Sequence, residues 1–189
     1  MTPFRAGGRA SLPSGAMVVW SVAEGVRGRR WREAITVDGS LRRALLLEAS
    51  PAGRATRLEL TTVAGLLTLH PDTDSRELHG NVVTPSGIRH LRFDWSPEHE
   101  LFVVGSPASA SVALRRFADV LAIGETQQVP GVSIDDALEP RPGAWQVTRA
   151  AVGDWDLRRD DGSEEDRTSL DEEGIPILPG AVSWPLETD

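Results

Sequence analysis

The chain has 189 residues, 40% of them apolar, and it contains no cysteine, tyrosine or lysine, so all 20 basic residues are arginines. This length and composition are typical of one globular domain and exclude a disordered chain. The missing residue types exclude disulfides, thiolate chemistry, Schiff-base lysines and lysine-dependent phosphate loops.

The net charge of −8 is concentrated near the C-terminus. Residues 151–189 hold 12 acidic residues and three arginines, whereas residues 1–150 hold 16 acidic residues and 17 arginines. We interpret the acidic segment 154–174 as a solvated loop or a repelling sheet edge. The nearly neutral body predicts no nucleic-acid partner, although it leaves a local arginine patch open.

Residues 1–16 combine Pro, Gly and Arg without a continuous apolar run. We expect a flexible leader there rather than a secretion signal, followed by a single β-rich domain over 17–189. No apolar run approaches the roughly 18 residues of a membrane span, so no transmembrane segment is predicted and the expected location is the cytoplasm.

Alternation with a period of two dominates the chain from residue 17 onward. Residues 29–37 place Trp31 and Ile35 on one face and Arg30 and Arg32 on the other. Similar alternation recurs in TRLEL, IRHLRFDW, AWQVTR and DWDLR, with turn signals such as VDGS, SPAG and TPSG between the runs. We predict a mostly β fold, a curled antiparallel sheet of roughly ten strands that resembles a β-roll.

One stretch, SPASASVALRRFADVLAIGE, departs from this alternation. Leu114, Phe117 and Leu121 follow helical spacing, and Ser106 before Pro107 is a favourable N-cap pair. We therefore predict one short helix near 107–119.

The arginines and serines of two short stretches allow both a functional and a structural interpretation. Arg115 and Arg116 carry forked donors suited to an anion, or else they hold nearby acids and carbonyls on the outer helix face. The serines before them lack a nucleophile elbow and a lysine base. In VRGRRWR (26–32), alternation turns the indole of Trp31 away from the arginines, which argues against base stacking beside phosphate contacts.

The four histidines show no metal-binding spacing, so no metal site and no cofactor are predicted. His79 and His90 could still lie on neighbouring strands close to carboxylates. This arrangement leaves open a small hydrolase or isomerase. A purely structural or partner-binding domain is the third alternative.

Six tryptophans are unusual in a chain without tyrosine. Any single one is best explained as core, but several rings on the concave side of a curled sheet could line a cleft. We predict Trp31, Trp95 and Trp145 as the cleft wall.

The stretch SPASASVALRRF (106–117) resembles the Ser-Pro…Arg-Arg motif of a glycolipid-binding family of small bacterial proteins with a roll-like sheet. The similarity continues through VLAIGETQQVPGVSID, ALEPRPGAWQVTR and SLDEEGIPILPGAVSW. The resemblance implies binding rather than catalysis. We therefore expect a glycolipid or acyl compound to bind between the tryptophans and an orienting set made of Ser106, Arg115 and Arg116.

Overall fold

The computed structural model describes residues 4–12, 14–72, 74 and 76–186. Nine strands form a large antiparallel sheet in the order β14-β1-β2-β3-β4-β5-β6-β7-β8. They are β1 (Phe4–Ser11), β2 (Met17–Gly25), β3 (Gly28–Val37), β4 (Ser40–Ala49), β5 (Ala55–Thr62), β6 (Gly65–Asp72), β7 (Glu77–Thr84), β8 (Gly87–Asp94) and β14 (Val182–Pro185). Apart from β14, neighbouring strands follow one another in sequence, so the sheet is the predicted meander.

Five further strands form a smaller sheet in the order β13-β12-β11-β10-β9. They are β9 (Glu100–Val103), β10 (Thr126–Ile134), β11 (Arg141–Arg149), β12 (Asp154–Arg159) and β13 (Glu165–Ser169). All its pairs are antiparallel except β9 with β10, which is parallel because α1 (Pro107–Arg115) lies between them in sequence. The mostly β, single-domain prediction is confirmed, with two sheets rather than one. The acidic segment forms β12 and the edge strand β13.

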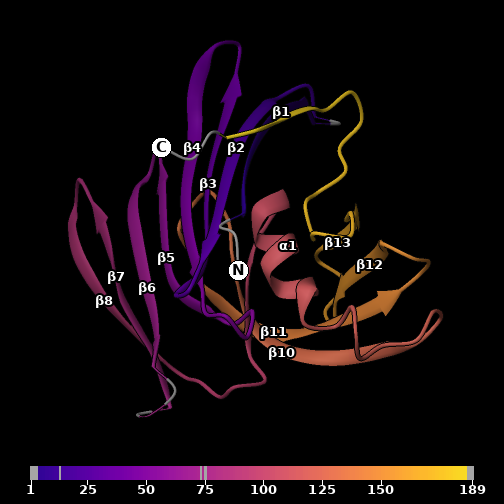
Figure 1. Ribbon diagram of the computed structural model, residues 1–189. Coiled ribbons are helices and arrows are strands. Elements are labelled where there is room, and N and C mark those ends of the chain that lie inside the picture. Colours follow the sequence, from indigo (N-terminus) through magenta and orange to yellow (C-terminus); the bar gives the residue numbers. More distant parts are fainter. Residues whose placement is uncertain (1–3, 13, 73, 75, 187–189) are drawn as a thin grey trace.

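Helix α1 lies between the two sheets (Figure 1). Every residue from Pro107 to Leu114 is buried, and the helix is built from small side chains. Ala108 and Val112 pack with the large sheet, whereas Ala110 and Leu114 pack with the small one. The hydroxyls of the buried Ser109 and Ser111 donate to the carbonyls of Leu101 and Gly174, and the small residues let both sheets approach the helix.

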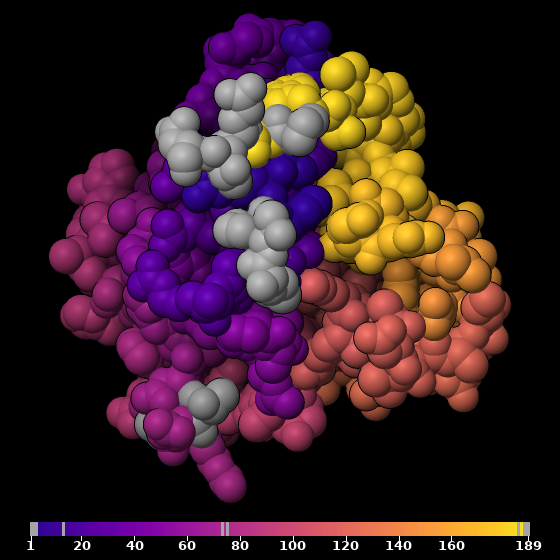
Figure 2. Space-filling model, in the orientation of Figure 1, coloured from indigo at the N-terminus to yellow at the C-terminus, as the bar shows by residue number. Residues whose placement is uncertain are grey.

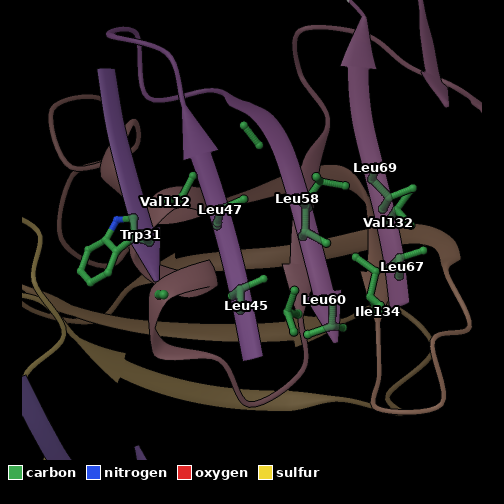
Figure 3. Packing of buried hydrophobic residues seen from close by; sticks show 14 of the residues in the cluster. Trp31, Leu45, Leu47, Leu58, Leu60, Leu67, Leu69, Val112, Val132 and Ile134 are labelled. Atoms are coloured by element: carbon green, nitrogen blue, oxygen red, sulfur yellow. The ribbon is translucent and has the colours of Figure 1, made fainter. Parts of the chain in front are cut away.

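The interior of the large sheet is filled by leucines that alternate along β4, β5 and β6, together with Trp31 of β3 (Figure 3). Val132 and Ile134 of β10 reach the same cluster from the small sheet. One apolar core therefore joins the two sheets and the helix.

The predicted leader is wrong for the residues that the structure describes. Phe4–Ser11 form β1, which pairs with β2 along its whole length and with β14 on its other side. The C-terminal segment thus lies beside the N-terminal strands (Figure 2). The alternation pattern did not reveal this strand because its alanines and glycines do not distinguish an apolar face from a polar one. The absence of a side chain at Gly8 leaves the space that the Trp20 ring occupies. Residues 1–3 and 13 of the predicted leader lie outside the described residues.

The helix begins at Pro107 as predicted but ends at Arg115 rather than near residue 119. Beyond it the backbone forms i→i+3 bonds, for example from the N–H of Phe117 to the carbonyl of Leu114. The guanidinium of Arg149 donates to the carbonyls of Ala118 and Leu121, each at 2.7 Å. These two carbonyls therefore accept from a side chain rather than from the backbone N–H groups of a continuing helix. In the described part of the chain, no helix is long and apolar enough to cross a membrane.

Candidate ligand-binding site

The Ser-Pro…Arg-Arg stretch fastens the helix to its surroundings. Ser106 is the N-cap of α1: its hydroxyl accepts from the N–H of Ser109 at 3.1 Å and donates to the carboxylate of Glu33 at 3.0 Å. The same Glu33 oxygen accepts from the N–H of Ala108. A carboxylate from β3 therefore occupies the helix N-terminus, where the dipole favours an anion.

Glu33 is a buried residue beside the start of α1 that the sequence pattern did not predict as part of a site. It is 4% exposed on the inner face of β3, and Arg43 of β4 lies 3.6 Å from its other oxygen. Burial raises the pKa of Glu33, against the opposing effects of Arg43 and the two hydrogen bonds. Arg43 also donates to the carbonyls of Val104 and Gly105. The network ties the large sheet to the loop before α1.

Both arginines of the motif are engaged by the protein itself. Arg115 donates to both oxygens of Glu24, which also accepts two bonds from Arg29. Burial opposes ionisation of Glu24, but the hydrogen bonds from the two arginines outweigh it and lower its pKa.

Arg116 donates to the carbonyls of Pro97 and Glu98, and its Nε lies 2.8 Å from the carboxylate of Glu100. Glu100 is 1% exposed, and desolvation raises its pKa to about 8. The structural alternative for the two arginines therefore accounts for their observed contacts.

The three predicted tryptophans do not share a cleft. Trp31 is 0% exposed and Trp95 is 5% exposed, and both belong to the core of the large sheet. Trp145 belongs to a separate cluster, and its ring stacks on that of Phe102 with the ring centroids 4.5 Å apart. Alternation correctly placed the rings on the inner face, but the opposing sheet and helix fill the space in front of two of them.

Trp145 does line a cleft, which lies between the helix and strands β11–β13 and has a volume of about 300 Å³. We call it the Trp145 cleft. Its apolar lining includes Phe102, Val103, Ala110, Trp145 and Leu157. Its polar lining includes Ser106, Ser109, Ser163, Glu164, Glu165 and Asp166. Of the predicted binding residues, the fold brings only Trp145 and Ser106 to this place.

Two polar atoms on residues of the cleft lack a hydrogen-bond partner among the described residues: Nε1 of Trp145 and Oε2 of Glu164. The other oxygen of Glu164 lies 3.1 Å from Arg141. Desolvation raises the pKa of Glu164, against the effects of Arg159 and Arg141. The indole nitrogens of Trp20 and Trp31 also lack acceptors, but neither ring lines this cleft.

The histidines offer no comparable arrangement. His90 shares a hydrogen bond with the side chain of Asn81, and His79 stacks on His70 with ring centroids 5.7 Å apart. His79 and His90 lie exposed on the large sheet, and neither lines the Trp145 cleft. Among the described residues, no group of three or more His, Asp or Glu side chains could hold a metal ion.

The arrangement defines a class of protein: a β fold of two sheets around a buried helix, with a small half-apolar cleft over the smaller sheet. No family model and no curated protein matches the chain. The fold is similar to the crystal structure of a DUF1089 family protein from Pseudomonas aeruginosa, with a TM-score of 0.55 and 18% sequence identity. The match covers 95% of this chain and 90% of that one, and at this identity it shows the fold alone.

Proposed function

We propose that the protein binds, without catalysis, a small amphipathic molecule in the Trp145 cleft. The carrying observation is that one side of the cleft is apolar, with Phe102, Trp145 and Leu157, whereas the other side carries hydroxyl and carboxyl groups. A hydroxyl group both donates and accepts, so a hydroxyl-rich head group could bond to the exposed carboxylates of Glu165 and Asp166. The apolar part of the ligand would lie against Phe102 and Leu157. A glycolipid-type ligand, as the motif resemblance implies, meets both requirements.

The residues that would contact the head group differ from the arginines expected from the sequence. Arg115 and Arg116 are held by Glu24, Glu100 and backbone carbonyls, and neither lines the cleft. The polar side of the cleft carries Glu164, Glu165 and Asp166 instead. Carboxylates accept hydrogen bonds from sugar hydroxyls and repel anions, so we propose a neutral polyol head.

The volume limits the size of the ligand. Ligand pockets span about 300–1,000 Å³, so a cleft of about 300 Å³ stands at the lower bound. A cleft of this size suits one sugar ring that carries one short alkyl chain, whereas a two-chain lipid would leave most of its apolar surface in water.

The test uses octyl glucoside below its micellar concentration, followed by isothermal calorimetry, with glucose and octanoate as half-ligands. Trp145→Phe keeps an aromatic ring beside Phe102 but removes part of the ring surface that lines the cleft. Losing about 40 Å² of apolar contact at roughly 25 cal/mol per Å² costs about 1 kcal/mol, so the Kd should rise roughly 2- to 10-fold. Trp155→Phe is the matched control, because Trp155 is buried in the same cluster but does not line the cleft.

Stronger binding of octyl glucoside than of either half-ligand, weakened only by Trp145→Phe, would support the proposal. The absence of saturable binding, or an equal loss in both variants, would exclude it.

A further inference from the structure

A second feature lies on the outer face of the large sheet, away from the Trp145 cleft. The side chains of β1, β2 and β3 alternate between the core and the outside. The arginines exposed on these strands are Arg5, Arg9, Arg30 and Arg32. The acidic residues of the same strands, Glu24 and Glu33, lie on the inner face. In a chain with 28 acidic residues, this face therefore carries four positive charges and no described acid of its own strands.

The arginines surround an open hollow of about 340 Å³. It is lined by Arg5, Ser21, Val22, Ala23, Arg30, Arg32 and Leu186. Cross-strand register explains its shape: Ala23 pairs with Arg5 on one side and Arg30 on the other, and Ser21 pairs with Arg32. Two small side chains on β2 form the floor, and long arginines from β1 and β3 form the walls.

The spacing suits one anionic group. Arg5 and Arg30 are separated by two strand spacings, about 10 Å between their Cα atoms, and Arg30 and Arg32 by about 7 Å along β3. Arginine side chains can converge across such distances on a tetrahedral anion, and their planar forks match phosphate and sulfate oxygens.

Little in the protein neutralises these charges. Arg30 pairs with Glu48 of β4 at 2.6 Å. Arg5 and Arg32 form no ion pair with any acid among the described residues. This contrasts with Arg29 and Arg43 on the inner face of the sheet and Arg115 at the end of the helix, which all form ion pairs with acidic side chains.

The hollow is bordered by apolar groups and by a second, larger hollow. An added Cβ on Gly7 would lie 3.1 Å from Nε1 of Trp184 and 3.5 Å from Leu186, so both side chains lie over this glycine beside the arginines. Trp184 is 39% exposed. A neighbouring hollow of about 530 Å³ at the β2–β3 turn shares Arg5, Ala23 and Arg30 with the first. A ligand larger than a free anion therefore has room.

We propose that this hollow binds a phosphate or sulfate group carried by a small molecule or a lipid head group, with Arg5 and Arg32 as the main contacts. The site is separate from the Trp145 cleft, and neither proposal depends on the other. Mutual repulsion of the unpaired guanidinium groups is relieved when an anion binds. The exposed Trp184 and Leu186 would contact the apolar part of the ligand or the surface of a bilayer.

The experiment titrates the full chain at low ionic strength with inorganic phosphate, sulfate and glycerol 3-phosphate, followed by ¹H–¹⁵N NMR, with chloride as the reference. Arg32→Gln should weaken binding roughly 10- to 150-fold, because hydrogen bonds to charged groups contribute about 1.5–3 kcal/mol. Arg9→Gln is the matched control, since it removes the same charge from the same face but does not line the hollow.

A vesicle arm separates the two sources of the anion. Phosphatidylcholine vesicles with and without phosphatidic acid are tested by co-sedimentation. Saturable binding of a free anion, or of the acidic vesicles alone, supports the proposal if Arg32→Gln weakens it more than Arg9→Gln does. An equal loss of anion or vesicle binding in the two variants would show that the net positive charge of the whole face attracts anions without a specific site. DNA binding that both variants weakened equally would lead to the same conclusion. That result, or no binding in any arm, would overturn the site.

Discussion

Burial of Glu100 should make the free energy of unfolding fall as the pH rises, and the substitution Glu100→Gln tests this contribution alone. The side chain is 1% exposed at the start of β9, and burial raises its pKa to about 8 from an ordinary value of 4.5. In the unfolded chain the carboxyl loses its proton near pH 4.5, whereas in the folded protein it keeps it until about pH 8. Below pH 4.5 both states are protonated and folding carries no penalty from this group.

As the pH rises through this window, the unfolded state holds fewer protons, so the free energy of unfolding falls. One pKa unit corresponds to about 1.4 kcal/mol, so the full shift amounts to about 5 kcal/mol at pH 8. Glu100→Gln keeps the shape and cannot ionise. The variant should therefore become progressively more stable than the native protein between pH 4.5 and 8, at about 1.4 kcal/mol per pH unit.

Urea denaturation of both proteins across this range measures the difference directly. Glu98→Gln is the control, because hydrogen bonding from Ser96 lowers the pKa of this exposed carboxyl. Glu98 is therefore ionised in both states above about pH 5.5, and over that part of the window its substitution adds no slope. A stability difference between native protein and Glu100→Gln that stays constant with pH would refute the reasoning. It would mean that Arg116 keeps Glu100 ionised in the folded state.

Three further predictions follow from contacts described above. Ser106→Ala removes the N-cap and one donor to the buried Glu33, and should lower the free energy of unfolding in urea by about 1–2 kcal/mol; an unchanged midpoint would contradict the capping role. Arg115→Met should cost less than about 1 kcal/mol, because the ion pair is partly exposed, and should leave octyl glucoside binding unchanged by calorimetry; lost binding would show that the arginine contacts the ligand after all. Gly8→Ala places a Cβ 2.4 Å from the Trp20 ring and should lower the free energy of unfolding by about 1–3 kcal/mol, measured by thermal unfolding. As the control, a Cβ on Gly25 meets open space, so Gly25→Ala should change the free energy of unfolding by less than about 0.5 kcal/mol. Equal effects of the two substitutions would disprove the close packing of β1 against the Trp20 ring.

The local elements were predictable because their signals are local. The period-two pattern around Trp31 places the indole inward and Arg30 and Arg32 outward, as the structure has them. The turn at Asp38 and Gly39 has positive φ at both residues, which is what the VDGS signal favours in a tight hairpin. Ser106 before Pro107 correctly marked the start of the helix.

The pairing of distant segments had no such signal. β1 reads as a leader because its Ala and Gly residues give no apolar contrast between its two faces. Its two partners, β2 and β14, lie at opposite ends of the chain. Glu33 and Arg43 sit at positions that an alternation argument assigns to apolar residues. Their burial depends on contacts that only the tertiary structure supplies: with each other, with the loop before α1 and with the start of the helix.

The sequence by itself determined a β-rich domain with one helix and a set of inward-facing indole rings, because side-chain alternation and helix capping act over a few residues. Only the tertiary structure decided which rings face protein and which lines a cleft, and which arginines are neutralised. Those outcomes depend on the side chains that two sheets and a helix bring opposite one another across the core. No short stretch of sequence contains that information.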